Sequence, residues 1–501
     1  MRPLQAHTVL HVEPPIFELG AAGRSGASLP EMDVPEIDPG QEFGVDVLRC
    51  EDPLLPEVSE LEVIRHYTRL SQWNYSIDEG FYPLGSCTMK YNPRVNEWTA
   101  RLQGLTDIHP YQNDDQIQGA LELMWRLEHA LAAVGGFARV TLQPAAGAHG
   151  EFTGLKVIRA ALSARGERRR KVLVPDSAHG TNPASVAFNG FAPVLLASGE
   201  AGILRPQDVE QALEREGADQ VAALMVTNPN TLGLFESHIA EIAKILHSAG
   251  AMLYMDGANL NAIMGKVRPA DTGVDVMHYN LHKTFSTPHG GGGPGAGPVG
   301  VTEELARFLP VPVVERRNGR FVLDYDRPDS VGRVRSFMGN FGVLVRAYTY
   351  LREMGADGIA RATELAVLNA NYVRARIEKE YPAQYGGACL HEVVLSDHRI
   401  EKETSVTTLD VAKRLIDYGF HPPTIYFPLI VHGALMIEPT ETEPLEEVER
   451  FCQAMEAIFV EAHEDPELLK HAPHSRGVNR MDEVRAARKP VLRWRPEASD
   501  S

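Results

Sequence analysis

The sequence predicts an α/β fold whose large domain holds a mostly parallel, seven-stranded type of sheet, followed by a smaller α+β domain. The first reason is an alternation of short apolar runs with helical patterns in the middle of the chain. The apolar runs span residues 172–174, 221–226 and 252–255, and the helical patterns span 151–164, 207–215 and 238–247. The second reason is a change of order after about residue 341, where long helical stretches replace the alternation. Parallel strands of this kind need helices on both faces of the sheet.

The composition argues against several classes of function. The chain has 501 residues, of which 44% are hydrophobic and 23% charged, as in ordinary globular proteins. Its formal net charge of -18 argues against nucleic acid or an anionic membrane as a partner, because both would repel it. No apolar run reaches the roughly 18 residues of a membrane span. Cys50, Cys87, Cys389 and Cys452 lack the short spacing of a metal or dithiol motif, so we expect no metal site and a reducing, cytoplasmic location.

The length exceeds what one hydrophobic core usually supports, so we expect several regions. These are an N-terminal arm with helices and a site-forming loop at 1–117, a large cofactor-binding α/β domain at 118–340, a C-terminal α+β domain at 341–480 and a tail at 481–501. The first 58 residues or so are rich in proline, glycine and glutamate and show little periodicity. An arm of this length is expected to lie on another surface, such as a second subunit.

A turn-dense segment at 80–93 lies between two predicted helices, at 61–75 and 118–134. It combines aromatic, hydroxyl and cationic side chains. A surface loop is the usual structure for such a composition, but the aromatic residues and Leu84 give this one a reason to be buried. We therefore predict that it forms a wall of an active site.

The smaller domain is expected to begin with helices and to continue with mixed elements. The helical patterns lie at 344–353, 365–380, 410–418 and 445–461, and the strand patterns lie around Val393 and at 435–437. The last residues, 497–501, are polar and are expected to be frayed.

Lys283 is the residue around which we place the chemistry. It follows a short apolar strand pattern and precedes a glycine-rich stretch that includes Gly290–Gly293. A lysine beside backbone that allows close approach favours a covalent amine over a solvated charge. We predict that Lys283 forms a Schiff base with pyridoxal phosphate and that His282 lies in the same site. The glycine run either shapes an entrance or only turns the chain back into a strand at 298–301, and the sequence leaves both open.

Asp256 closes the predicted strand at 252–255 and precedes Lys283 by enough chain for one further strand crossover. Pyridoxal phosphate accepts electrons only while its ring nitrogen stays protonated, and a half-buried carboxylate holds that proton. An aspartate that starts a turn after a strand is the common alternative. With Lys283 downstream, we favour the cofactor role.

Small residues at 143–150 precede the helical pattern that starts near Glu151. Free N–H groups at a helix N-terminus attract an anion, so Ala146, Gly147 and Ala148 are candidates for binding the cofactor phosphate. The motif is weak by itself, since many helices follow a glycine. Its place in the strand and helix alternation is what favours the assignment.

Two further segments follow predicted strands. In 177–183, His179 is placed to stack on the pyridine ring and Thr181 or Asn182 to contact its polar substituents, although a lone histidine is more often structural. Residues 227–231 either line the same pocket or form a capping turn, with no preference between the two.

Two groups of arginines have less specific interpretations. The basic run at 168–171 is expected to be a solvated loop. Arg333 and Arg335 are candidates for binding a substrate carboxylate, because guanidinium groups offer two parallel donors. The sequence does not choose between them.

Taken together, these stretches resemble the pyridoxal-phosphate subunit of glycine decarboxylase, the P-protein of the glycine cleavage system, and specifically subunit 2 of its two-subunit form. The matching segments are 80–93, 171–185, 255–262, 280–285, 337–341, 421–424 and 438–443. The resemblance implies fold type I architecture with the cofactor covalently bound to Lys283. It also implies glycine as substrate and a lipoylated H-protein that receives the aminomethyl group.

The one-chain P-protein has two homologous halves, and this chain resembles only the half that carries the lysine. The resemblance therefore implies a separate subunit 1 and an α2β2 heterotetramer. The 83–93 loop would help to form the wall of a cavity for the lipoyl arm. Cys87 in that loop is expected to be a packed thiol rather than a redox-sensitive one.

Two other functions would also account for part of this pattern. Another fold type I lyase or aminotransferase acting on a small amino acid shares Lys283 and Asp256, so only the resemblance of 83–93 and 422–443 discriminates against it. A non-catalytic partner that only docks the lipoyl protein is disfavoured, because it has no use for a buried amine at Lys283.

Overall fold

The computed structural model describes residues 12–51, 53–289 and 295–495. The chain divides into two compact units. One comprises residues 1–76, 416–419 and 471–501, and the other comprises residues 77–415 and 420–470.

The second unit is built on a seven-stranded sheet with the strand order β1-β7-β6-β5-β4-β2-β3. Its strands are β1 (Arg139–Thr141), β2 (Lys171–Pro175), β3 (Ala192–Leu196), β4 (Val221–Thr227), β5 (Met252–Gly257), β6 (Val276–Tyr279) and β7 (Val299–Val301). Five neighbouring strands run parallel, and β7 runs antiparallel to both of its neighbours. The predicted mostly parallel sheet is confirmed, and each of the three predicted strands lies within an observed one.

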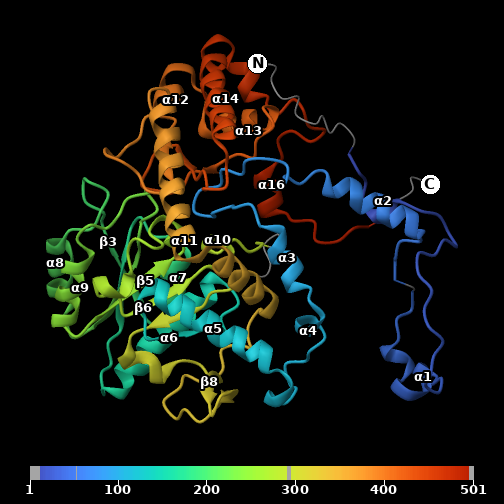
Figure 1. Cartoon of the computed structure of the whole chain (residues 1–501). Helices are drawn as coiled ribbons and strands as arrows, with labels where there is room; N and C mark the ends of the chain where they lie inside the picture. Colours follow the sequence, from blue (N-terminus) through green and yellow to red (C-terminus); the bar gives the residue numbers. More distant parts are fainter. Residues whose placement is uncertain (1–11, 52, 290–294, 496–501) are drawn as a thin grey trace. The chain divides into compact units, whose positions relative to one another are not determined.

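Helices cover both faces of this sheet (Figure 1). They are α5 (Gln118–Gly135), α6 (Gly147–Ala164), α7 (Thr181–Phe188), α8 (Pro206–Glu216) and α9 (Ile239–Ser248). Alternate residues of one strand enter different cores, because successive side chains of a strand point to opposite faces. Val172 and Val174 pack with α6 and α7, whereas Leu173 packs with α5, α8 and α9.

The C-terminal part carries a small antiparallel sheet with the order β10-β12-β11. Its strands are β10 (Val393–Ser396), β11 (Thr424–Ile425) and β12 (Ala434–Ile437). The helices of this part are α11 (Phe341–Ile377), α12 (His398–Thr404), α13 (Thr408–Asp417), α14 (Leu445–Glu464) and α15 (Pro466–Lys470). The predicted α+β pattern is confirmed. The two predicted helices at 344–353 and 365–380 belong to one element, α11, which Gly355 interrupts with a φ of 62° and a ψ of -174°.

The segment at 80–93 is a loop, as predicted, and much of it is buried. It is followed by α3 (Arg94–Ala100) and α4 (Gln103–Thr106), and the hairpin of β8 (Val313–Arg317) and β9 (Arg320–Asp324) lies later in the same unit. Phe81 is 1% exposed and packs edge-on against Phe451, with ring centroids 5.1 Å apart. These apolar contacts hold the loop inside the fold.

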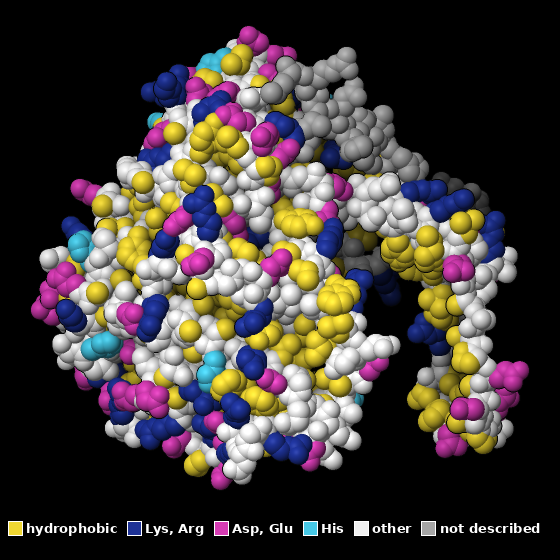
Figure 2. Space-filling model, in the orientation of Figure 1, with side chains coloured by type: hydrophobic (Ala, Val, Ile, Leu, Met, Phe, Trp, Pro, Cys, Tyr) yellow, Lys and Arg dark blue, Asp and Glu magenta, His cyan; other side chains and the backbone are white. Residues whose placement is uncertain are grey.

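The first unit contains α1 (Pro39–Phe43), α2 (Glu60–Ser71) and α16 (Glu483–Arg488). A capping box between Ser59 and Glu62 starts α2. The helix ends at Ser71, four residues before the predicted end, because the N–H groups of Trp73 and Asn74 bond to carbonyls three residues back and close turns. The arm segment that carries α1 and α2 displays many hydrophobic side chains on its surface (Figure 2).

No helix in the described ranges is both long and apolar enough to cross a membrane. The expected frayed residues, 497–501, lie outside the described ranges.

Candidate functional site

A cavity lies where β4, β5 and β6 end, beside the first turn of α6. Its lining includes Ser86, Gly147, Ala148, Glu151, His179, Thr181, Thr227, Thr231, Asp256, Ala258, Asn259, His278, Asn280, His282 and Lys283. The carboxyl ends of parallel strands are the usual ligand-binding edge of such a sheet. The sheet thus brings Lys283, Asp256, His179 and Thr181 together, although they are far apart in the sequence.

Lys283 lies on α10 (Leu281–Thr284), a single turn that follows β6. The backbone on both sides of the lysine is fixed: the N–H of Leu281 donates to Ala296 O at 3.1 Å, and the N–H of Thr284 donates to Asn280 O at 3.1 Å. Leu281 is fully buried. Among the described residues, the Lys283 amine has no hydrogen-bond or ion-pair partner, so it is available to a ligand.

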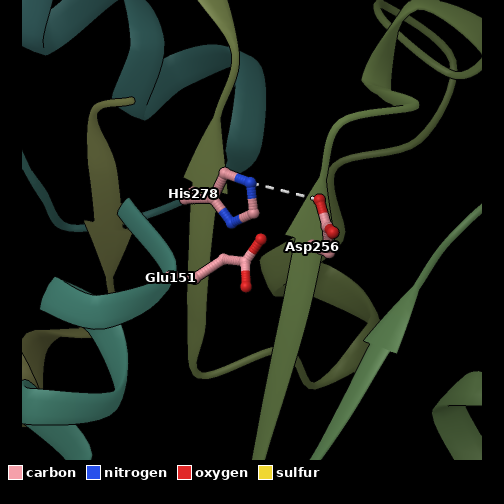
Figure 3. A group of neighbouring side chains, drawn as sticks. All are labelled: Glu151, Asp256 and His278. Carbon is pink, nitrogen blue, oxygen red and sulfur yellow. Dashed lines mark ion pairs between the residues drawn. The ribbon is translucent and has the colours of Figure 1, made fainter. Parts of the chain in front are cut away.

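Asp256 and His278 form a buried ion pair across neighbouring strands (Figure 3). Asp256 is paired with His278 in the register of β5 and β6, and Oδ1 lies 3.1 Å from Nε2 of the imidazole. Asn182 Nδ2 donates to the other carboxylate oxygen at 3.0 Å. Tyr254 places its hydroxyl 2.9 Å from Nδ1 of His278.

These contacts shift both pKa values in favour of the charged pair. Burial opposes ionisation of Asp256, but the charge and hydrogen bond of His278 outweigh it and hold the pKa of the carboxyl well below its usual range. Burial likewise opposes protonation of His278, and the carboxylate of Asp256 raises the pKa of the imidazole despite it. The site therefore keeps a carboxylate ionised at the end of β5, where the sequence predicted one.

Glu151 is the third member of this buried group, and the sequence did not identify it (Figure 3). It lies on α6 and is 3% exposed. Oε1 accepts a hydrogen bond from Thr181 Oγ1 at 2.9 Å, whereas Oε2 has no partner among the described residues. Asn280 Oδ1 and Thr227 Oγ1 are also buried and unpartnered. These atoms line the cavity and leave hydrogen-bonding capacity for a polar ligand.

The predicted phosphate-binding segment lies at the site, with one correction. The helix begins at Gly147 rather than near Glu151, because Ala146 is its N-cap and its carbonyl already accepts from the N–H of Gly150 at 2.9 Å. Gly147 and Ala148 therefore belong to the first turn and line the cavity, whereas Ala146 lies outside that lining. A side chain at Gly147 would collide with Asn280 Oδ1.

The two predicted histidines both line the cavity but differ in burial. His179 is exposed, and its Nδ1 lies 3.0 Å from Thr181 Oγ1. Burial lowers the pKa of His282 to about 3, so this imidazole is neutral. Thr227 and Thr231 line the cavity as well. Asn228 and Asn230 accept hydrogen bonds from the N–H groups of Glu236 and Leu232, so the segment also forms a capping turn and has both of the predicted roles.

Both arginines predicted to bind a substrate carboxylate lie outside the cavity. Arg333 and Arg335 are not among the lining residues of the cavity, and Arg333 lies over the ring of Tyr325 instead.

The basic run at 168–171 was predicted to be a solvated loop, and this prediction is wrong for Arg169. Its guanidinium is largely buried and donates to the carbonyls of Ala218, Val221 and Ala249, each at 2.9 Å, because five fixed donors can join three segments.

Gly290–Gly293 lie outside the described residues, so neither structure suggested for the glycine run is described. The strand expected after it is β7. Cys87 is largely enclosed, and burial raises the pKa of its thiol, as expected for a packed thiol.

His278 was not predicted as a site residue, although it lies only five residues before Lys283. The sequence signal that could have identified it is its position on the next predicted strand after the one that Asp256 closes, because neighbouring parallel strands end at the same edge of the sheet. Glu151 and Asn280 carried no comparable signal, because a glutamate in a helix and an asparagine before one are both common.

Comparisons with known proteins agree with this architecture. Residues 153–293 match the class-V aminotransferase family, and residues 362–474 match the C-terminal domain of glycine dehydrogenase. A crystal structure of glycine decarboxylase (P-protein) of the glycine cleavage system, in inhibitor-bound form, has a TM-score of 0.69 and 21% identity, covering 84% of this chain and 94% of that one. A cysteine desulfurase from Thermococcus onnurineus NA1 has a TM-score of 0.59 and 17% identity, covering 76% of this chain and 95% of that one. Both likenesses show the fold.

The fold and site thus define the class: an α/β enzyme of the class-V aminotransferase type, fold type I. Closer relatives give the family. Proteins named "probable glycine dehydrogenase (decarboxylating) subunit 2" are 58% identical in Caldanaerobacter subterraneus subsp. tengcongensis and 56% identical in Bacillus velezensis. These matches cover 96% of this chain and 98% and 97% of those proteins. The chain belongs to the family of glycine dehydrogenase (decarboxylating) subunit 2. This identity over nearly the whole chain decides against a different lyase or aminotransferase.

The fold and the family imply pyridoxal phosphate as cofactor, and the residues of the cavity fit it. An ionised carboxylate, an unpaired lysine amine and a helix N-terminus with a glycine in its first turn offer one partner each for the ring nitrogen, the aldehyde and the phosphate. The unpartnered oxygens of Glu151, Asn280 and Thr227 add polar capacity on the walls.

Proposed function

We propose that this chain is the cofactor-binding subunit of a glycine decarboxylase. Together with a subunit 1 it removes CO2 from glycine and passes the remaining aminomethyl group to the lipoyl arm of an H-protein. The observation that carries the proposal is that Lys283 shares one cavity with the buried Asp256–His278 pair, in a chain of this family.

In this proposal Lys283 binds the cofactor covalently through its amine. Gly147 and Ala148, with their N–H groups in the first turn of α6, bind the phosphate, because the helix dipole favours an anion there. Thr181 and His282 complete the cofactor contacts, and His179 covers the ring. When bound, pyridoxal phosphate supplies a ring that accepts the electrons released by bond cleavage.

Asp256 holds a proton on the ring nitrogen of the bound group. Its carboxylate stays charged because His278 pairs with it and Asn182 donates to it, so the proton remains on the nitrogen rather than on the acid. His278 keeps its own charge through the same contact. This division of protons is what the electron-accepting ring requires.

The surrounding residues orient the reactants and exclude water. Ser86 and Asn259 line the cavity and bind Glu392, which is fully buried behind that wall. A reacting bond must be held in one orientation relative to the ring, and rigid walls supply that orientation. The 83–93 loop is proposed to form part of the passage for the lipoyl arm.

Membership of a subunit 2 family implies a subunit 1 partner. We propose an α2β2 heterotetramer in the cytoplasm, with further site residues supplied by that partner. The regions predicted at 1–117, 118–340, 341–480 and 481–501 remain part of this proposal.

The direct test replaces Lys283. We expect the wild-type chain with its partner to bind pyridoxal phosphate as a visible chromophore, and the Lys283→Ala variant to lack that absorbance while keeping the wild-type melting temperature without cofactor. Glycine-dependent exchange of labelled bicarbonate, with lipoylated H-protein, should fall by about a hundredfold or more in the variant. Lys266→Ala, an exposed lysine of the same unit, is the control. A wild-type protein that stays colourless, or exchange by this chain without subunit 1, would contradict the proposal.

A further inference from the structure

The loop beside the cavity is bound to the C-terminal part of the chain by three acidic side chains. Every second residue of the loop between 86 and 90 contacts a different glutamate. The contacts are Ser86 N to Glu392 Oε2 at 2.8 Å, Thr88 N to Glu438 Oε2 at 3.0 Å and Lys90 Nζ to Glu441 Oε1 at 2.7 Å. The backbone turns here rather than running extended, since Ser86 and Thr88 have positive φ values of 59° and 25°, and their N–H groups point to the two glutamates.

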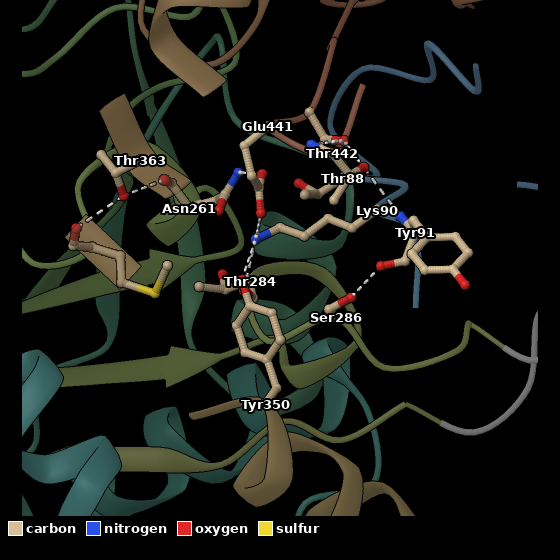
Figure 4. Close-up of polar contacts among 12 residues, drawn as sticks. Thr88, Lys90, Tyr91, Asn261, Thr284, Ser286, Tyr350, Thr363, Glu441 and Thr442 are labelled. Atoms are coloured by element: carbon tan, nitrogen blue, oxygen red, sulfur yellow. Dashed lines mark hydrogen bonds and ion pairs between the residues drawn. The ribbon is translucent and has the colours of Figure 1, made fainter. Parts of the chain in front are cut away.

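Lys90 differs from the other two because it carries a full charge into the interior. Its side chain is 1% exposed, and that of Glu441 is 7% exposed. The ammonium also donates to the carbonyl of Thr284 at 2.9 Å and contacts the hydroxyl of Tyr350 at 3.5 Å (Figure 4). The three donors of a lysine are thus directed at a carboxylate, a backbone carbonyl and a phenol.

Thr284 is the last residue of α10 and directly follows Lys283. A helix of four residues cannot hold its own conformation, since forming one turn costs more entropy than one hydrogen bond returns. Its final carbonyls also need donors from outside the helix. The Lys90 ammonium supplies such a donor, and a positive charge is the favourable one at a helix C-terminus.

A second anchor lies two residues further along. Ser286 Oγ donates to Tyr91 O at 2.8 Å and accepts from Asn92 Nδ2 at 3.2 Å. The segments 90–92 and 284–286 therefore lie side by side. Figure 4 shows Lys90 between Glu441 and the end of α10. No step in the proposed chemistry uses Lys90, so its burial needs another reason.

Stability alone does not supply that reason. A buried ion pair is often no more stabilising than two apolar side chains of similar volume, because desolvation of the charges offsets their attraction. What an apolar pair does not provide is a donor for the Thr284 carbonyl. The feature that requires a lysine here is the contact with the backbone that carries Lys283.

We propose that Lys90 is a positioning residue for the Lys283 amine: Glu441 fixes the ammonium, and the ammonium fixes the end of α10 through the Thr284 carbonyl. This inference rests on the proposed role of Lys283. The conformation of α10 then depends on a residue about 190 positions earlier in the chain, and the loop at 86–90 both closes the cavity and orients its nucleophile.

The test compares a single variant with a double variant in the full chain. Lys90→Met leaves Glu441 buried without its partner and is expected to lower the melting temperature. Lys90→Met/Glu441→Leu removes both charges and is expected to recover most of that loss. The matched control is Lys171→Met/Glu216→Leu, which removes another partly buried ion pair. Lys171 is the first residue of β2, at the end of the strand away from the cavity.

Two measurements are made on each protein without its cofactor. One is the rate and affinity with which added pyridoxal phosphate forms the visible chromophore; both Lys90 variants should lose about tenfold or more, and the control should not change. The other is the rate of amide hydrogen exchange over residues 281–286. This rate should increase in both Lys90 variants, and the control variant should keep the wild-type rate there.

Wild-type chromophore formation and wild-type exchange in the double variant would overturn the proposal, because the charges would then serve folding only. The second measurement separates this inference from the proposed function. If the wild-type protein forms no chromophore but exchange at 281–286 still accelerates in the double variant, the role of Lys283 fails while the positioning by Lys90 holds.

Discussion

Buried ionisable side chains around the cavity fall into two kinds. In the Asp256–His278 pair each group stabilises the charge of the other, so both stay ionised. Glu392 and Glu438 face each other at the ends of β10 and β12, and two like charges in that position repel. Burial raises the pKa of both carboxyls, and the repulsion adds to this for Glu392.

Glu438 should make the stability of the chain depend on pH. Burial raises its pKa from 4.5 to about 7, so between these values the folded chain binds a proton that the unfolded chain has released. This contribution to the free energy of unfolding is fully present below pH 4.5 and falls as the pH rises toward 7. His391 and Glu392 face the group directly. The hydrogen bonds from Thr88, and then the charges of Lys283 and Lys90, partly offset the rise in the pKa of Glu438.

Glu438→Gln keeps the shape and removes the titration. From pH 5 to pH 8, we expect the free energy of unfolding of the variant to gain roughly 1–3 kcal/mol relative to wild type, measured by denaturant unfolding. The exposed Glu446→Gln on α14 should show no such trend. If the free energies of unfolding of Glu438→Gln and wild type differ by the same amount from pH 5 to pH 8, the raised pKa of Glu438 is contradicted.

At the scale of elements, close packing of α6 against the sheet places the site residues. Gly150 lies one turn into α6, and a Cβ there would stand 2.8 Å from both Gly297 O and His278 Cβ. Real side chains do not approach this closely, so His278 and the segment before β7 keep their places only while residue 150 lacks a side chain. The Asp256–His278 pair depends on that packing.

Gly150→Ala should therefore displace His278 and lower the free energy of unfolding by about 1–3 kcal/mol, with weaker retention of pyridoxal phosphate. Gly119→Ala on α5 is the matched control, because nothing lies within 4 Å of its added Cβ. We expect that control to be neutral or more stable, since alanine is the better helix former. Denaturant unfolding and cofactor titration check both variants, and equal behaviour of the two would refute the packing argument.

At the scale of the whole molecule, the unit formed by 1–76, 416–419 and 471–501 exposes much apolar surface. Leu61, Ile64 and Tyr67 on one side of α2 are 55%, 59% and 56% exposed. Side chains of this kind at helical spacing are normally covered. Since a subunit 1 partner is implied by the family, that partner is the expected cover.

Leu61→Ser/Ile64→Ser should weaken association with subunit 1 about tenfold or more and leave the fold of the chain unchanged, because both side chains are exposed in the chain by itself. Phe188→Ser, which removes a side chain that is 79% exposed on α7, is the control. Sedimentation or light scattering of the mixed subunits measures the association. Wild-type association by the double variant would show that α2 is not covered by the partner.

The sequence by itself determined the parallel sheet, because apolar runs and helical periods are local patterns that identify strands and helices directly. It also predicted Lys283 and Asp256 as site residues, since each follows a recognisable strand, and both line the cavity. The exact ends of elements were less predictable: α2 ended early and α6 began early, because capping contacts of single residues set those ends.

The tertiary structure alone decided which distant side chains meet. The register of β5 and β6 brings His278 to the cavity, and the packing of α6 brings Glu151 there, while Arg333 and Arg335 lie outside it. The contact of Lys90 with Glu441 and the Thr284 carbonyl joins three segments far apart in the chain. Local sequence patterns carry no record of such pairings, because burial and approach of these groups arise only when the whole chain has folded.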